Sequence, residues 1–224
     1  MNCLLHRLGL MPYEEAYGLQ MRLWSEKAAG RPEDFLLLLE HPPTLTLGKS
    51  GKMSHLLVEK EDLAKEGLSL FFTDRGGDIT YHGPGQIVAY PIFDLRRRGK
   101  DVHRYVHDLE EAVIGTLKDF AIEAGRDREH IGVWTGRDKI AAIGVRVRRW
   151  ITMHGLALNV NPDLRHFSLI TPCGIADKGV TSMAKLLERP PPLDDVADRL
   201  VAHFSRIFDV TMEEGAEDLA GRSS

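Results

Sequence analysis

The sequence predicts an α/β (α+β) fold, a single domain in which helices flank a central mixed β-sheet. Helical and strand-like segments alternate along the 224 residues without an internal repeat. A hydrophobic share of 43% and a charged share of 28% are typical of a globular protein with one large core. We place the domain at residues 1–212 and expect the polar segment 213–224 to be a flexible tail.

The first half of the chain begins with a helix. Apolar residues recur at helical spacing over 13–28, and Gly30 ends this helix. The continuous apolar run 35–39 is typical of a buried strand. A short helix over 61–67 and a strand over 68–72 follow.

A long helix opens the second half. Asp101 is its expected N-cap, and its apolar stripe runs as far as Ala121. Strand-like segments follow, and after Pro192 helical spacing returns in a final helix. The predicted strands are 131–135, 140–147 and 151–160, and the final helix spans 193–207.

The most unusual segment is Arg75–Gln86, which holds four glycines and one proline in twelve residues. This composition does not suit the interior of a helix or strand. It is compatible with a hairpin whose polar residues are incidental. However, the triplet Thr80-Tyr81-His82 lies between the two glycine clusters. Because glycine lets the backbone approach a ligand closely, we expect a functional site here.

These residues resemble the signature of a known family. Arg75-Gly76-Gly77, Thr80-Tyr81-His82, Gly85-Gln86 and Tyr90 resemble the motif of the octanoyltransferases, also called lipoate-protein ligase B. The match covers roughly residues 10–187, and it implies the fold shared by biotin and lipoate protein ligases. Further segments resemble the family in the same order: 40–48, 132–134, 139–145, 155–159 and 171–175.

Cys173 is the candidate nucleophile. It lies between Pro172 and Gly174, where a tight turn can expose its sulfur to a pocket, although the local sequence also allows an inert cysteine. Both His82 and Lys139 are candidate partners, and a lysine in this setting is usually a surface residue. In the family a lysine pairs with the cysteine, which implies a catalytic dyad of Cys173 and Lys139 with His82 in the site wall.

The other cysteine, Cys3, has no polar neighbours and is expected to be a packing residue.

The resemblance also implies an apolar slot for an octanoyl chain. Burying six methylenes at ~0.8 kcal/mol each contributes about 5 kcal/mol. Small residues in these segments leave room for the chain, or they simply allow strands to pack closely. The expected substrate-binding residues are Arg75, Gly76, Gly77, Asp78, Ile79, Thr80, Tyr81, His82, Ala142, Ile143, Gly144, Gly155, Leu156 and Ala157.

The implied reaction has two steps. Cys173 attacks octanoyl-acyl carrier protein, and a lysine of a lipoyl domain then takes the octanoyl group from the cysteine. The implied acceptors are lipoyl domains of 2-oxoacid dehydrogenase E2 subunits and the glycine cleavage H protein. The alternatives are an ATP-dependent lipoate or biotin ligase, a cysteine thioesterase, and an acyl-binding protein without catalysis.

Composition restricts partners and location. A net charge of −4 and a pI near 6.2 argue against a nucleic-acid binder. No apolar run approaches the ~20 residues that span a bilayer, and the N-terminus lacks a signal-peptide pattern. Two cysteines favour the reducing cytoplasm. We expect a cytoplasmic monomer with no metal and no cofactor, since no metal-ligand spacing occurs.

Two basic clusters, 96–100 and 146–149, are candidate docking sites for the acidic protein partners of this family. A solvated turn or an outward strand face explains each cluster equally well. In the second cluster Arg146 and Arg148 alternate, so they are expected to share one strand face.

Overall fold

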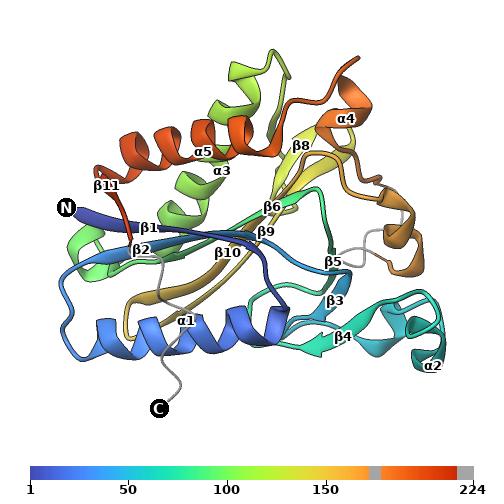
Figure 1. Cartoon of the computed structure of the whole chain (residues 1–224), viewed down its shortest axis with the longest axis horizontal. Coiled ribbons are helices and arrows are strands. Elements are labelled where there is room, and N and C mark those ends of the chain that lie inside the picture. Colours follow the sequence, from blue (N-terminus) through green and yellow to red (C-terminus); the bar gives the residue numbers. More distant parts are fainter. Residues whose placement is uncertain (172–177, 216–224) are drawn as a thin grey trace.

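Two β-sheets with helices packed on their faces make up the fold (Figure 1). This computed structural model describes residues 1–171 and 178–215. The large sheet has the order β11-β1-β2-β6-β10-β9-β8-β7. β1 runs parallel to β2 and β11, and the other neighbouring pairs are antiparallel, so the predicted mixed sheet is confirmed.

The strands of the large sheet draw on both halves of the chain. Its central strands are continuous apolar runs because both of their faces are covered by helices. The eight strands are β1 (Asn2–Leu10), β2 (Asp34–Glu40), β6 (Gln86–Ile92), β7 (Gly125–Arg126), β8 (Val133–Thr135), β9 (Asp138–Arg148), β10 (Ile151–Asn159) and β11 (Thr211–Glu214).

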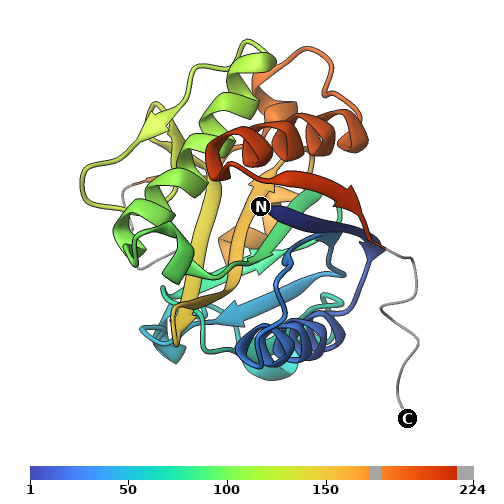
Figure 2. The ribbon, with the colours of Figure 1, turned by 90° about the vertical axis from the view of Figure 1, so that its left-hand side faces the viewer.

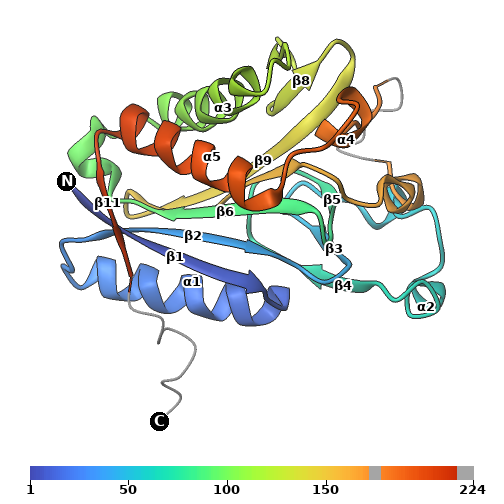
Figure 3. The same cartoon turned by 45° about the horizontal axis from the view of Figure 1, so that its top comes forward.

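Long helices cover both faces of the large sheet. α1 (Tyr13–Ala28) lies on one face, and α3 (Val102–Asp119) and α5 (Leu193–Phe208) lie on the other (Figures 2 and 3). Asp101 caps α3 as predicted, because its side chain accepts a hydrogen bond from the Arg104 amide (3.0 Å). No helix in the described parts of the chain combines the length and the apolar character needed to cross a bilayer.

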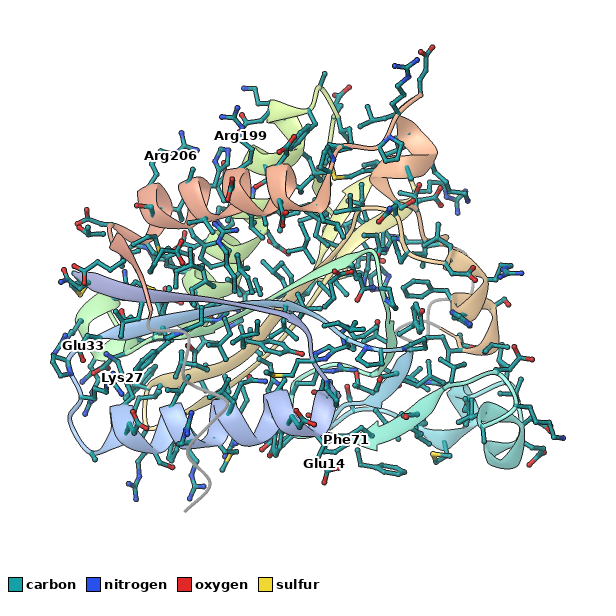
Figure 4. The ribbon with its side chains drawn as sticks, viewed as in Figure 1. Glu14, Lys27, Glu33, Phe71, Arg199 and Arg206 are labelled. Atoms are coloured by element: carbon teal, nitrogen blue, oxygen red, sulfur yellow. The ribbon has the colours of Figure 1, made fainter. Side chains whose placement is uncertain are left out.

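A three-stranded sheet extends the molecule beyond the start of α1 (Figure 1). Its strands are β3 (Thr44–Leu47), β4 (Ser69–Phe72) and β5 (Ile79–His82). Phe71 contacts Tyr13 with ring centroids 4.9 Å apart, and Figure 4 shows Phe71 beside Glu14 at the first turn of α1. Short helical segments complete the fold: η1 (Met53–His55), α2 (Lys60–Leu63), η2 (Leu95–Arg98), η3 (Leu164–Leu169) and α4 (Met183–Leu186).

Several predicted boundaries were wrong. The predicted helix 61–67 is shorter, since α2 ends at Leu63. α3 ends at Asp119, and Ala121 adopts a positive φ of 58°, outside the helix. The predicted tail begins two residues too early, because Glu213 and Glu214 pair with β1 in β11. Residues 216–224 of that tail lie outside the described residues.

A buried ion network joins α1 to the start of β2. Asp34 Oδ1 lies 2.7 Å from Lys27 Nζ, and its Oδ2 accepts a hydrogen bond from Arg98 (3.0 Å). Lys27 also donates to the carbonyl of Glu33, which neighbours it in Figure 4. Cys3 is fully buried nearby, and burial raises the pKa of its thiol to about 12, so its predicted packing role is confirmed.

Candidate active site

A cavity of about 550 Å³ lies between the small sheet and the open part of β9. β8 pairs with β9 only as far as Ala141, so the edge of β9 beyond that residue is free to form a wall. The structure brings every predicted substrate-binding residue except Tyr81 to this cavity, together with Lys139. Their binding of substrate stays a prediction.

Arg75 holds one wall in place. Its guanidinium group donates hydrogen bonds to the carbonyl oxygens of Thr46 (2.7 Å) and Asp78 (2.7 Å), and it is only 8% exposed. The Gly76 amide donates to Val145 O (2.9 Å), which joins the loop to the free edge of β9. The arginine therefore shapes the loop at residues 75–78.

Glycines at two positions serve close packing. A Cβ on Gly144 would lie 2.8 Å from Gly76 O, and one on Gly155 would lie 2.1 Å from Ala89 O. Neither contact is tolerable for a methyl group. At these two positions the absence of a side chain lets neighbouring backbones pack closely. This was the alternative to a role in making room for the acyl chain.

Tyr81 lies outside the cavity, which corrects its predicted place in the slot. The segment Thr80-Tyr81-His82, predicted as part of a loop, is a strand paired with β3. Side chains alternate along a strand, so Tyr81 points away from Thr80 and His82. Its hydroxyl bonds to His166 Nδ1 (3.0 Å), and its ring packs on Phe167.

His82 is a buried, neutral wall residue. Its Nδ1–H donates to Gln86 Oε1 (3.0 Å), and its Nε2 accepts from Thr46 Oγ1 at 3.4 Å. Burial, with the nearby charge of Arg75 as a smaller cause, holds the pKa of His82 well below its usual value. An uncharged ring whose two nitrogens are occupied does not stabilise a thiolate as a cation.

Aromatic side chains close the cavity behind His82. Tyr90 donates to His41 Nε2 (2.8 Å), while His41 Nδ1–H donates to Met11 O (2.7 Å). Burial lowers the pKa of His41 to about 4. Tyr13 contacts both histidine rings, so this end of the cavity is a rigid, neutral wall.

Lys139, the second residue of β9, is buried in the cavity wall. The residue is 8% exposed, and its Nζ lies 4.7 Å from the ring centroid of Trp134. Lys178 Nζ lies at the same distance from that ring and pairs with Asp127. The usual surface setting of a lysine therefore does not apply to Lys139.

Cys173 lies outside the described residues, within the gap at 172–177. The residues on either side of that gap are fixed at the cavity walls. The Thr171 amide donates to His55 O (2.8 Å), and the Lys139 amide donates to Gly179 O (2.9 Å). Because His55 and Lys139 both line the cavity, the chain enters and leaves the gap there.

Known proteins share this sequence over most of its length. A family model described as the lipoyl protein ligase A/B catalytic domain matches residues 12–205. The octanoyltransferase of Caldicellulosiruptor saccharolyticus is 52% identical over 203 residues, which cover 90% of this chain and 86% of the relative. That of Solibacter usitatus is 51% identical over 215 residues, or 96% and 97%.

The chain belongs to the octanoyltransferase family. The predicted enzyme class, an acyltransferase, is confirmed by these relatives.

Solved structures show that the family's fold is the predicted one. A bipartite lipoate protein ligase from Thermoplasma acidophilum has a TM-score of 0.75 at 19% identity, covering 98% of this chain and 91% of that one. Biotin protein ligase from Aquifex aeolicus has a TM-score of 0.51 at 10% identity, covering 93% and 69%. The biotin and lipoate ligase fold is therefore confirmed.

The first basic cluster, 96–100, does not line the cavity. Two of its arginines form ion pairs that stabilise the fold. Arg96 pairs with Asp94 (2.7 Å), and Arg98 pairs with the buried Asp34. The Leu95 amide donates to the carbonyl of Trp150, which places this cluster beside the turn after β9.

The second cluster lies at that turn. The guanidinium groups of Arg146 and Arg148 lie 5.9 and 5.6 Å from the Trp24 ring centroid, so they share a strand face as predicted. Arg148 is separated from Lys139 by about 30 Å of strand, at ~3.3 Å per residue. Docking at either cluster stays a prediction.

Sequence reasoning missed several cavity residues. Tyr13, His55, Ile131 and His154 line the cavity but were not assigned to it. His154 combines a positive φ of 57° with burial in β10. Backbone strain of this kind cannot be predicted from the type of residue. For Tyr13 the helical spacing indicated only a buried face, and α1 covers the cavity as well as the core.

Proposed function

We propose that this enzyme transfers an octanoyl group from octanoyl-acyl carrier protein to one lysine of a lipoyl domain, through a thioester on Cys173. The supporting observation is the buried Lys139, whose backbone binds one flank of the segment that carries the cysteine, in the wall of a cavity large enough for an acyl chain.

Lys139 and Cys173 form the dyad of this proposal. The ammonium form of this lysine stabilises a nearby thiolate, and its amine form can accept a proton. The electron-rich face of Trp134 holds the ammonium form beside the cavity. His82 does not compete for this role, because it is neutral and both of its ring nitrogens are occupied.

The first step forms the thioester. The Cys173 thiolate attacks the donor carbonyl, and the carrier thiol leaves with a proton from Lys139. The tetrahedral oxyanion needs hydrogen-bond donors in the wall. The Gly76 amide already donates to Val145 O, so it is not one of them. The Gly77 amide has no acceptor among the described residues and is the candidate donor of this loop.

The acyl chain occupies the apolar part of the cavity. Ile143 and Leu156 are neighbours on β9 and β10, and Val106 of α3 lies on the same cavity wall. Tyr13, His82 and Tyr90 form a neutral wall at the other end, with His41 packed behind them. At ~0.8 kcal/mol per methylene, a longer chain gains binding energy only until it meets this wall.

The acceptors in this proposal are lipoyl domains of 2-oxoacid dehydrogenase E2 subunits and the glycine cleavage H protein, and the enzyme acts as a cytoplasmic monomer. The reaction uses no ATP, because the thioester already carries the energy that the amide needs. An ATP-dependent ligase of the same fold would require it.

Incubation of the protein with octanoyl-acyl carrier protein, without ATP or acceptor, tests the proposal by intact mass. We expect one stable octanoyl adduct, which disappears when a lipoyl domain is added. Absence of reaction until ATP is supplied would indicate a ligase. Continuous release of octanoate would indicate a thioesterase, and binding without an adduct would indicate an acyl-binding protein.

A further inference from the structure

An aspartate–histidine pair lies at the cavity wall and has no part in the proposed dyad. His55 Nδ1–H donates to Asp78 Oδ2 at 2.5 Å. Asp78 is itself held by the amides of Ile79 (2.7 Å) and Lys52 (3.3 Å), so the carboxylate is fixed. The histidine side chain is 25% exposed, and within residues 1–171 and 178–215 its Nε2 has no partner. A ring held in this way presents one nitrogen as a proton acceptor.

Other histidines of the cavity are arranged differently. Both nitrogens of His82 are hydrogen-bonded. His154 is also paired with a carboxylate, Asp74 (2.9 Å), but its Nδ1 is sealed from solvent without a partner. The side chain of His130 bonds to no carboxylate in the described parts of the chain. His55 alone among these four combines an aspartate partner with an open nitrogen.

The proton balance of the second step leaves a role for a second base. The acceptor lysine arrives as an ammonium ion, and its nitrogen must lose two protons to become the amide. As the C–N bond forms and the C–S bond breaks, the sulfur leaves as the Cys173 thiolate. Lys139 takes one proton and becomes the ammonium that stabilises this thiolate. The thiolate could take the second proton only by giving up its ion pair with Lys139, so a further base in the cavity wall would keep the dyad in its thiolate–ammonium form.

We propose that His55, oriented by Asp78, is the catalytic base that accepts this second proton and passes it to solvent. The proposal rests on the proposed function, since it concerns the same acyl-enzyme. The products of the step are the octanoyl amide, the Cys173 thiolate, the Lys139 ammonium ion and protonated His55, which balances both protons.

The position of His55 supports this role. Its carbonyl accepts the Thr171 amide at 2.8 Å, and Leu56 pairs with Ile170 in an antiparallel bridge. Cys173 follows Thr171 by two residues, so covalent geometry alone keeps their Cα atoms within about 8 Å of each other. The covalent connection therefore limits how far the acyl thioester of the proposed mechanism can lie from His55, whose side chain is exposed enough to meet an incoming amine.

The test separates the two half-reactions by single-turnover kinetics with octanoyl-acyl carrier protein and a lipoyl domain. In His55→Gln we expect acyl-enzyme formation at the wild-type rate and transfer to the lipoyl domain slowed about 100-fold. Added imidazole should restore transfer in His55→Ala, since it supplies the missing base. The backbone contact between His55 and Thr171 survives both substitutions.

His203→Gln is the matched control, because His203 also pairs with an aspartate (Asp119, 2.9 Å) but lies on α5, facing the end of α3 and not the cavity. It should transfer at the wild-type rate. Wild-type transfer in His55→Gln, or equal slowing of both steps with no imidazole rescue, would overturn the role of His55 while leaving the proposed function intact. If the wild-type protein forms no acyl-enzyme, the proposed function itself fails.

Discussion

Lys139 is the residue on which the proposed chemistry depends most. Its local sequence favours the surface, yet its side chain is 8% exposed and packs on Trp134 and against Gly132. Family resemblance singled it out, and the structure places it in the wall of the cavity. A substitution can distinguish a lysine that exchanges protons from one that serves only as a fixed cation.

Lys139→Arg keeps the positive charge, but arginine stays protonated at working pH and cannot accept a proton from the attacking amine. The carrier sulfur can still leave as a thiolate, so we expect acyl-enzyme formation to survive better than transfer, and the variant should accumulate octanoyl-Cys173. Loss of a general base typically slows a step 10²- to 10⁴-fold, and the second step should slow on that order. Rapid-quench measurement of both steps checks this. Equal loss in both would indicate steric damage instead.

At the scale of elements, the site depends on how the loop at 75–78 meets β9. The Gly76 amide bonds to Val145 O, and Gly144 leaves space for the loop. Arg75 then fixes the loop to β3 through Thr46. The cavity wall is therefore made by contacts between elements that are about 70 residues apart in the chain.

Gly144→Ala should disturb this wall, because its Cβ would lie 2.8 Å from Gly76 O and 3.3 Å from Arg75 Cδ. Overpacking of this kind costs about 1–3 kcal/mol of stability. We expect acyl-enzyme formation to slow at least about tenfold. Thermal unfolding and single-turnover kinetics measure both effects.

Gly18→Ala is the control for this substitution. Gly18 lies within α1, and a Cβ there meets nothing within 4 Å. Alanine favours a helix over glycine by up to about 1 kcal/mol, so this variant should be more stable with unchanged kinetics. Unimpaired acyl-enzyme formation in Gly144→Ala would contradict the role assigned to the loop contact.

The sequence predicted α1, α3, α5 and the strands β2, β9 and β10 because each buries a long periodic or continuous apolar run. The strand predicted over 131–135 began two residues before β8. β1 and β6 were not predicted as strands, β7 has only two residues, too few for a periodic pattern, and β5 was hidden by its glycine-rich flanks. Glycine content predicted a site at 75–86, and most of these residues line the cavity, but only the pairing with β3 decides that Tyr81 faces away from it.

At the scale of the whole molecule, the buried histidines predict a pH dependence of stability. Burial lowers the pKa of His6, His41, His82 and His154 in the folded protein, and for His41 the value is about 4. In the unfolded chain these histidines bind protons near pH 6.5. The stabilisation of the folded protein by the neutral histidines is therefore complete above that pH and is lost as the pH falls toward 4.

Urea unfolding at about pH 7 and about pH 4.5 measures this loss. His41 alone should account for about 2–3 kcal/mol between these values. Carboxylates with lowered pKa, such as Asp74, lose their contribution only below their unfolded pKa of ~3.8, outside this range. The variant His41→Gln should show a correspondingly smaller dependence. A stability that does not change over this range would contradict the neutral state assigned to the cavity wall.

The central claim is that the acyl group passes through Cys173. Peptide mapping after reaction with octanoyl-acyl carrier protein tests it most directly, with hydroxylamine to distinguish a thioester. We predict a hydroxylamine-labile octanoyl group on the peptide that contains 171–175. Cys3 is the internal control, because it is fully buried and its raised pKa keeps it a thiol. An octanoyl group on Cys3, or an ester on an oxygen elsewhere, would contradict the claim.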